Sequence, residues 1–174
     1  MKFIAAMLAG AAVAQTQDIK DKYPRWATEM DHYGYTWDAF EITTDDDYIL
    51  TTFRITGKSD GPIDVTKDAL LIMHGHTQDA ASWIRDYHVS PSKMDPPYPE
   101  EKPMPLQLAD LGYDVWMGNN RGTDYSLGHK TLATTEREYW NWTWSEMGLY
   151  DTPANVKFIK ENTKRDKIQY LGYS

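Results

Sequence analysis

The chain has 174 residues, enough for one domain with a buried core, and its 41% hydrophobic and 25% charged content is ordinary for a globular protein. A net charge of −8 without a cluster of Lys or Arg argues against a nucleic-acid partner. The absence of cysteine excludes disulfides, zinc–thiolate sites and thiol nucleophiles. We expect no cofactor and no stable protein partner.

The first residues have the pattern of a secretory signal peptide. Lys2 supplies a positive start, an apolar run (FIAAMLAGAAV) too short to span a bilayer follows, and the triplet AVA, ending at Ala14, has the small-x-small form that signal peptidase cleaves. A buried N-terminal helix is the alternative, although polar residues follow at once. We expect residues 1–14 to be removed, and the mature chain, residues 15–174, to be secreted or to enter the lysosomal or endomembrane lumen.

Two segments after the N-terminal region predict an antiparallel β-hairpin. Residues 37–43 (WDAFEIT) and 48–56 (YILTTFRIT) alternate apolar and polar side chains, and three aspartates at 45–47 mark a turn between them. A turn is favoured over a calcium loop for these aspartates because the EF-hand spacing is absent. Residues 58–61 (KSDG) predict a second turn.

Three short apolar runs are typical of strands that are buried on both faces. They are residues 69–73 (ALLIM), 113–117 (YDVWM) and 168–171 (IQYL). Since such runs are usual in parallel sheets covered by helices, they predict the central strands of the domain.

Helical patterns separate these runs, over residues 105–111 (PLQLADL) and over residues 145–162. Pro153 lies near the start of the second pattern, where helices accept proline, so the helix proper is expected to begin near Thr152. Residues 91–105 are rich in proline and predict a surface loop or insertion. A hairpin followed by buried strands that alternate with helices predicts an α/β fold, with a mostly parallel sheet and helices on both faces.

Small residues follow each buried run, at the edge where an open parallel sheet binds its ligands. The first run is followed by His-Gly-His (74–76), the second by Gly-Asn-Asn-Arg-Gly (118–122) and the third by Gly-Tyr-Ser (172–174). Gly-x-Ser directly after a buried strand is the first half of the G-x-S-x-G nucleophile elbow, in which a sharp turn lifts the serine hydroxyl above the sheet. The tripeptide alone is weakly specific, and its value comes from the strands and the His-Gly-His segment around it.

These segments also carry a resemblance to a known family. The stretches TTDDDYIL, LLIMHGHTQDAASWI, LADLGYDVWMGNNRGTDYS, and YWNWTWSEMGLYDTPANVKFI with KIQYLGYS resemble those of the acid lipases, in the same order from about Tyr33 to Ser174. The resemblance implies the N-terminal part of an α/β-hydrolase fold that hydrolyses acylglycerols or sterol esters through an acyl-enzyme, at a lipid–water interface. It assigns the nucleophile to Ser174 and one oxyanion-hole donor to the backbone N–H of His76.

The chain departs from the family pattern at several places. Family triads run Ser, then Asp or Glu, then His, so the acid and base are expected after Ser174, and this N-terminal part is expected to be inactive alone. Tyr173 replaces the family's His before the serine. His76 replaces a Leu, where its polar ring could alter contacts with an acyl chain. Asp46 or Asp47 replaces the turn glycine, and either residue tolerates the left-handed conformation.

Four further polar residues have structural interpretations. We expect Asn119 and Arg121 to tie the loop after the second apolar run to neighbouring carboxylates, with direct substrate contact as the alternative. Glu146 and Asp151 are expected as charges at a helix start rather than as catalytic acids.

Two other features point to ligands or modification. His74 and His76 could bind a metal, but no further cluster in the sequence completes such a site, and we expect none. Asn141 begins an N-x-T glycosylation sequon among aromatic residues that suggest partial burial.

Three functions fit these patterns. The leading one is a lipid ester hydrolase acting on triacylglycerols or sterol esters. The second is a non-catalytic secreted product that binds lipid or a partner through the exposed face of the site. The third is another serine hydrolase on the same fold, such as a peptidase, because a fold alone does not set the substrate. The stretches that resemble the acid lipases disfavour the third function. Sequencing the reading frame beyond Ser174 would distinguish the first function from the second.

Overall fold

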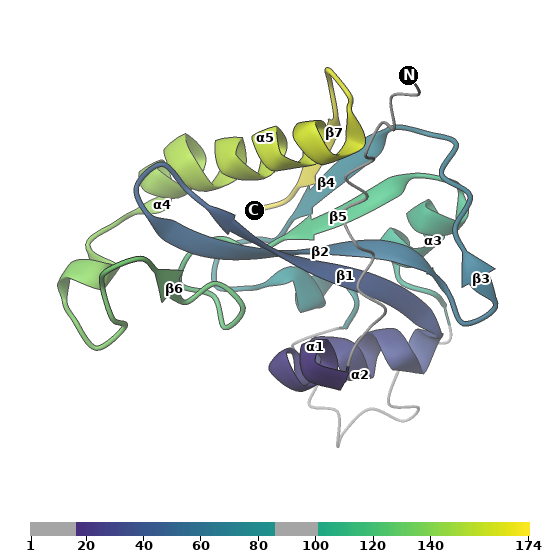
Figure 1. The fold of residues 1–174 in the computed structure, drawn as a ribbon, viewed down its shortest axis with the longest axis horizontal. Coiled ribbons are helices and arrows are strands. Elements are labelled where there is room, and N and C mark those ends of the chain that lie inside the picture. The colour runs from purple at the N-terminus through teal and green to yellow at the C-terminus, as the bar shows by residue number, and fades with distance from the viewer. Residues whose placement is uncertain (1–16, 86–100) are drawn as a thin grey trace, which may run out of the picture.

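A computed structural model describes residues 17–85 and 101–174, so the expected signal peptide and most of the proline-rich segment lie outside the described residues. The described strands form one sheet whose main path runs β1-β2-β5-β4-β7, with two short strands beside β2 (Figure 1). These strands are β1 (Tyr35–Thr43), β2 (Tyr48–Lys58), β3 (Gly61–Pro62), β4 (Ala69–Met73), β5 (Asp114–Gly118), β6 (Gly128–His129) and β7 (Gln169–Gly172).

The predicted hairpin is confirmed. Strands β1 and β2 are antiparallel along their whole length, and each begins or ends within two residues of the expected bounds. Asp47 adopts the left-handed conformation in the turn, with φ of 73°, which is the role expected for a residue in place of the turn glycine. The second turn is also confirmed, since Lys58 pairs with Gly61 across it.

The three apolar runs become the parallel strands β4, β5 and β7. The order is β5-β4-β7, and all side chains of β4 and β5 are buried, as predicted. The prediction is wrong for β7, because this strand ends the path of the described sheet and pairs only with β4 there. Its residue Tyr170 is 54% exposed.

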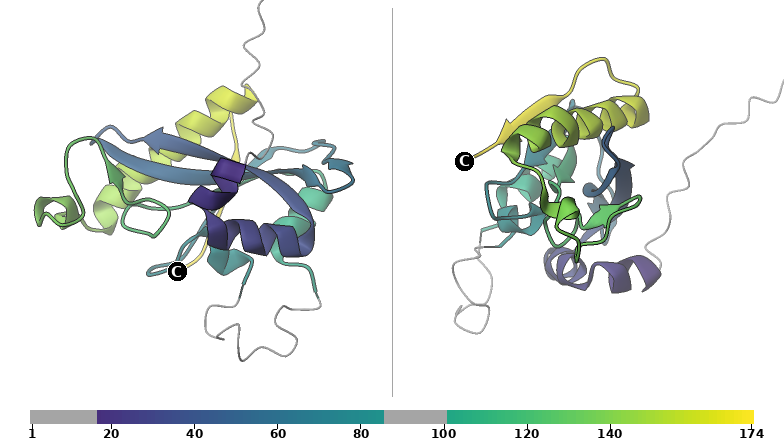
Figure 2. Two further views of the ribbon diagram at one scale, coloured as in Figure 1. Left: turned by 60° about the horizontal axis from the view of Figure 1, so that its bottom comes forward. Right: turned by 90° about the vertical axis from the view of Figure 1, so that its left-hand side faces the viewer.

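Helices cover both faces of the sheet, as predicted. The α-helices are α1 (Gln17–Lys22), α2 (Pro24–Tyr33), α3 (Met104–Asp110), α4 (Trp144–Glu146) and α5 (Thr152–Thr163). Successive side chains of β4 alternate: Ile72 packs in the core beneath α2 and α3, whereas Leu71 packs with Ile159 of α5. Figures 1 and 2 show α5 on one face and α1 and α2 on the other.

Aromatic rings fill the core between α2 and the hairpin. Trp26 of α2 stacks on Phe53 of β2 at 4.2 Å between ring centroids, and Trp37 of β1 meets Phe53 edge-on at 5.6 Å. Helix α2 was not predicted from the sequence, although Pro24 at its first position and the left-handed Gly34 after its end are ordinary helix boundary signals.

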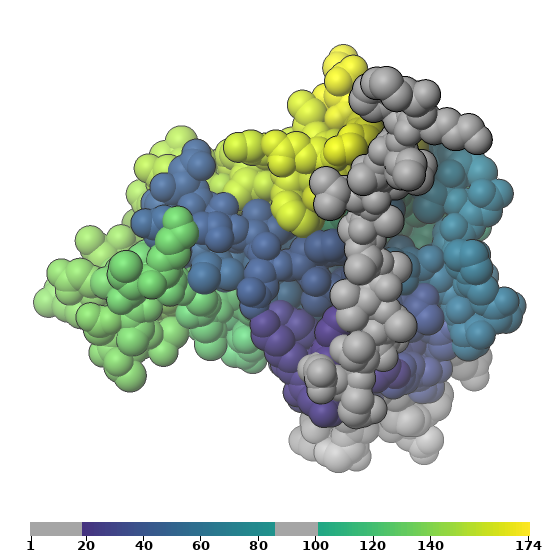
Figure 3. Space-filling model, viewed as in Figure 1, coloured from purple at the N-terminus to yellow at the C-terminus, as the bar shows by residue number. Residues whose placement is uncertain are grey.

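The second predicted helix is continuous but not uniform. It consists of α4, one π-helical stretch at Met147–Asp151, and α5, which begins at Thr152 as expected. The predicted helix at 105–111 is α3, one residue earlier, so the proline-rich segment ends at Pro103. No helix of the described residues is both long enough and apolar enough to cross a membrane. The segment from β6 to α4 forms a lobe at the left of Figures 1 and 3.

Candidate active site

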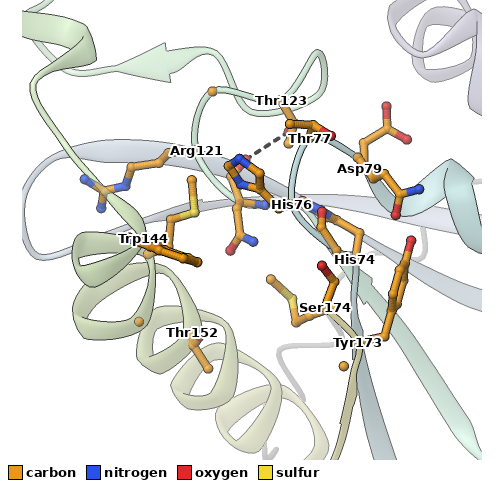
Figure 4. Close-up of a pocket in the computed structure, with 18 of the residues that line it drawn as sticks. His74, His76, Thr77, Asp79, Arg121, Thr123, Trp144, Thr152, Tyr173 and Ser174 are labelled. Carbon is orange, nitrogen blue, oxygen red and sulfur yellow. Dashed lines mark hydrogen bonds between the residues drawn. The ribbon is translucent and has the colours of Figure 1, made fainter.

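One pocket of about 1190 Å³ lies at the carboxyl ends of the parallel strands. The segments that follow β4, β5 and β7 all line it, together with the start of the helix that leads into α5 (Figure 4). The three small-residue segments that the sequence placed at strand exits are therefore brought together at one place, where an α/β sheet binds its ligands.

Ser174 lies in this pocket two residues after β7. Its φ is 68°, in the left-handed region that residues other than glycine seldom adopt. A positive φ at a serine two residues after a strand is compatible with the turn expected of a nucleophile elbow, and the assignment of Ser174 as the nucleophile stays a prediction.

Gly75 allows the segment after β4 to touch Ser174. A Cβ atom at Gly75 would lie 3.0 Å from the Cβ of Ser174 and 2.8 Å from the ring of Tyr173, closer than side chains normally approach. Only glycine leaves room for this approach. His76 follows Gly75 in the exposed turn, so its backbone is carried to the same wall of the pocket as the serine.

His74 is buried and joins two of the converging segments. The backbone N–H of Asn120 donates to its Nε2 at 3.1 Å, so Nδ1 carries the proton and donates to the carbonyl of Gly75 at 2.8 Å. Burial lowers the pKa of His74 below its ordinary value, which favours this neutral tautomer. Both ring nitrogens are used, and His74 therefore positions the turn at Gly75.

Arg121 ties its loop to carboxylates, as predicted. Its fully buried guanidinium forms two hydrogen bonds to Asp46, of 2.6 and 2.8 Å, and a further one of 2.8 Å to Asp151, and it lies 3.9 Å from the ring centre of Tyr48. The prediction for Asn119 is wrong in its partners, because its amide bonds to the backbone of Ala80 and Thr51 rather than to carboxylates.

The two expected helix-start charges differ. Glu146 forms a capping box with Thr143 and is confirmed in that role. Asp151 is not a helix-start charge: it is fully buried inside the continuous helix, at the end of the π-helical stretch, and it accepts from the backbone N–H of Arg121 at 2.8 Å. A sequence pattern cannot show the π-helical stretch that directs this carboxylate toward Arg121.

Three features of the site were missed from the sequence. Thr77 has a φ of 61°, a strained value for a β-branched residue, and it lines the pocket. Arg25 of α2 reaches the pocket and pairs with Asp79 at 2.6 Å. Trp144 stands at the pocket with 78% of its surface exposed. None of these has a signal in the sequence, because each depends on packing between distant segments.

The remaining candidates are simple to place. Asn141 is exposed, so the expectation of partial burial is wrong for this asparagine. His74 and His76 both line the pocket, and the part of the chain that the structure describes holds no group of three His, Cys, Asp or Glu side chains suited to a metal.

A β-hairpin beside parallel strands, with helices on both faces of the sheet, is the arrangement of an α/β-hydrolase fold. An esterase of Pyrococcus furiosus has a similar fold, with a TM-score of 0.50 and 22% identity over 83% of this chain and 42% of that one. Residues 27–87 match the family described as the partial alpha/beta-hydrolase lipase region.

By sequence, the chain is similar to several curated lipases. It is 38% identical to triacylglycerol lipase 2 of Arabidopsis thaliana over 85% of this chain and 33% of the relative. It is 35% identical to lipase member M of Mus musculus, over 82% of this chain and 31% of that lipase. The human lysosomal acid lipase/cholesteryl ester hydrolase is 32% identical to this chain, over 83% of this chain and 34% of that protein. The chain spans about a third of the length of these curated relatives.

Proposed function

We propose that this chain carries the nucleophile and one oxyanion-hole donor of a lipid ester hydrolase that works at a lipid–water interface in a secreted or lysosomal setting. The observation that carries the proposal is the position of Ser174, which lies two residues after β7 with a positive φ and against Gly75, in the pocket where the strand exits meet. The names of the relatives, a triacylglycerol lipase and acid lipases, support a lipid ester as the substrate.

The proposed chemistry is acyl transfer to serine. The hydroxyl oxygen of Ser174 attacks the ester carbonyl carbon, and its proton passes to a general base and then to the departing alcohol. The backbone N–H of His76 donates to the oxyanion that forms, which stabilises the transition state more than the substrate. Water then attacks the acyl-enzyme, and the fatty acid leaves with Ser174 restored.

The base is not assigned to His74. Its two nitrogens already bond to Asn120 and Gly75, and the lowered pKa keeps the ring neutral in a structural role. The curated relatives are about three times longer than this chain, and we propose that the triad acid and base belong to the region corresponding to that additional length.

The test compares Ser174→Ala with the wild-type protein at its natural length. Loss of the nucleophile should reduce the hydrolysis of a short-chain p-nitrophenyl ester by several powers of ten, on the order of 10⁶ as in another serine hydrolase. Ser145→Ala is the matched control, since Ser145 is exposed and lies outside the pocket lining.

A second measurement does not depend on turnover of a lipid. A fluorophosphonate should label Ser174, and mass spectrometry of the peptide should place the adduct on that residue. Hydrolysis that persists in Ser174→Ala would reject the nucleophile assignment. A protein of natural length that binds lipid but neither hydrolyses esters nor takes the label would instead be a non-catalytic binding protein.

A further inference from the structure

The lining of the pocket divides into two chemically different sides. Trp142, Trp144 and Met147, from the segment that leads into α5, form an apolar side. Thr77 and Thr123, from the turns after β4 and β5, belong to a polar side. Figure 4 shows Trp144 at the left, Thr77 and Thr123 at the top and Ser174 below them, so the serine faces a space bounded by both sides.

The apolar side contains one fixed ring and one available ring. Trp142 packs on Gly122 so closely that a Cβ atom there would lie 2.6 Å from the indole. Trp144 is 78% exposed, and its ring centre lies 6.2 Å from that of His76, which follows Gly75, the residue in contact with Ser174. An exposed indole in the lining of the pocket that also contains Ser174 offers an apolar surface that a hydrocarbon chain would remove from water.

The polar side carries hydrogen-bonding groups that the protein leaves unused. Gln78 donates its backbone N–H to Gly75 at 3.2 Å, which closes a turn with Thr77 at a position where glycine is usual. Among the described residues, the Thr77 hydroxyl has no hydrogen-bond partner, and neither has the amide oxygen of Gln78 or of Asn120. The two amide oxygens are buried, whereas Thr77 is an exposed residue of the pocket lining, so its hydroxyl is the group that can exchange a hydrogen bond with a ligand hydroxyl.

The charges on the polar side disfavour an anionic group. Arg25 lies 2.6 Å from Asp79 and 3.6 Å from Asp124, so two carboxylates oppose one guanidinium. A phosphate would meet net negative charge and brings no hydrogen-bond donor when ionised, whereas a neutral hydroxyl group meets neither obstacle.

We propose that the pocket holds its ester in one orientation, with the acyl chain along Trp144 and Met147 and a hydroxyl-bearing alcohol part against Thr77. The substrate class is then a partial acylglycerol, a mono- or diacylglycerol, rather than a sterol ester or a phospholipid. This inference rests on the proposed function, because the orientation places the ester carbonyl beside Ser174.

The test measures binding of ligands that cannot be hydrolysed, by calorimetry with the protein at its natural length. The ligands are 1-O-dodecylglycerol, which has two hydroxyls, 1-methoxydodecane, which has none, and dodecyl phosphate. Thr77→Val should weaken binding of 1-O-dodecylglycerol about three- to tenfold and leave 1-methoxydodecane unchanged, as expected for one lost hydrogen bond. Thr77→Ser keeps the hydroxyl and should bind like the wild type.

The apolar side has its own variant and control. Trp144→Ala should weaken binding of both uncharged ligands about tenfold, since both carry the same chain. Trp140→Ala, which removes a partly exposed indole from the same lobe but outside the pocket lining, should change neither. Dodecyl phosphate should bind more weakly than 1-O-dodecylglycerol.

The orientation is overturned if Thr77→Val weakens both uncharged ligands equally, if Trp144→Ala affects neither, or if dodecyl phosphate binds as tightly as 1-O-dodecylglycerol. Ser174→Ala separates this result from the proposed function, because the ether ligand has no carbonyl and should bind that variant normally. Hydrolysis that does not need Ser174 would then reject the catalytic proposal while the binding pattern still reports on the two sides.

Discussion

Two clusters of charged side chains sit at opposite ends of β2, and they differ mainly in burial. Near Tyr48, Arg121 is fully buried between two carboxylates. At the other end, Asp110 lies between two lysines, Lys58 at 2.7 Å and Lys102, whose side chains are both 39% exposed. Each cluster has one central charge and two opposite ones, yet only in the first are the central charge and one of its partners fully buried.

Ion pairs of the same kind contribute differently to stability in the two clusters. A surface ion pair is screened by water and contributes little, whereas a buried charge that loses its partners is costly. The buried cluster lies where the loop after β5 meets the helix leading into α5, and both line the pocket. None of the three residues of the exposed cluster lines the pocket. The ion pairs that are most costly to break therefore join two segments that line the candidate active site.

The largest effect is expected from Arg121→Ala. Removal of the guanidinium leaves the buried carboxylate of Asp151 without its partner, and we expect a loss of roughly 3–5 kcal/mol in the free energy of unfolding. Unfolding in denaturant measures this loss in the free energy of unfolding. Arg121→Lys is the informative companion, since it keeps the charge but cannot reproduce the paired hydrogen bonds to Asp46. A loss below about 1 kcal/mol for the alanine variant would show that burial does not distinguish the clusters.

The two carboxylates of the buried cluster should not be equivalent. Asp151 is fully buried and also accepts the backbone N–H of Arg121, whereas the side chain of Asp46 is 27% exposed. Burial raises the pKa of Asp151, while the hydrogen bonds from Arg121 lower the pKa of Asp46 despite its own burial. The raised pKa of Asp151 reflects only the cost of burying its charge, whereas the loss on substitution depends on its two hydrogen bonds of 2.8 Å from Arg121, one of which the amide nitrogen of asparagine cannot accept. Because this site is fully buried, we expect Asp151→Asn to destabilise the protein more than Asp46→Asn, by about 2 kcal/mol against about 1 kcal/mol. Equal losses in parallel melts would contradict this ranking.

His74 gives a pH-dependent test of the buried end. Its pKa is lowered by burial in the folded protein, so the unfolded chain binds the proton more readily below its ordinary pKa near 6.5. The contribution of His74 to stability is thus present above about pH 6.5 and is lost as the pH falls below that value. We expect unfolding experiments between pH 7.5 and 5 to show a decline on the order of 1 kcal/mol.

The control for this prediction is His74→Gln. Glutamine offers one donor and one acceptor for Gly75 and Asn120 but does not titrate in this range. The variant should therefore flatten the pH dependence between pH 7.5 and 5. If its curve falls as steeply as that of the wild type, other groups cause the decline.

Much of this fold could be predicted from local patterns, and the failures share a physical cause. The hairpin, β4, β5 and the start of α5 depend on periodicity and turn residues, which are visible in the sequence. The exposed face of β7 and the burial of Asp151 depend on which distant segments pack beside them, and no local pattern encodes this. Ser174 could be located by its strand and by resemblance, whereas the polar side at Thr77 required the assembled loops.

The smallest effect is expected at the exposed cluster. Burial raises the pKa of Asp110, but hydrogen bonds from Lys102, Lys58 and Tyr35 outweigh it and lower the pKa to about 2. A carboxylate with a lowered pKa contributes stability above its ordinary pKa near 3.8, and this contribution is lost as the pH falls toward 2.

Because water screens this cluster, Asp110→Asn should cost less than about 1 kcal/mol at pH 7, and the difference from the wild type should shrink in 1 M salt. The same salt should leave the loss in Arg121→Ala almost unchanged, because a buried pair is screened much less. Equal salt sensitivity of the two variants would show that both clusters are open to solvent. The contrast between the ends of β2 therefore depends on the salt response as well as on the size of either loss.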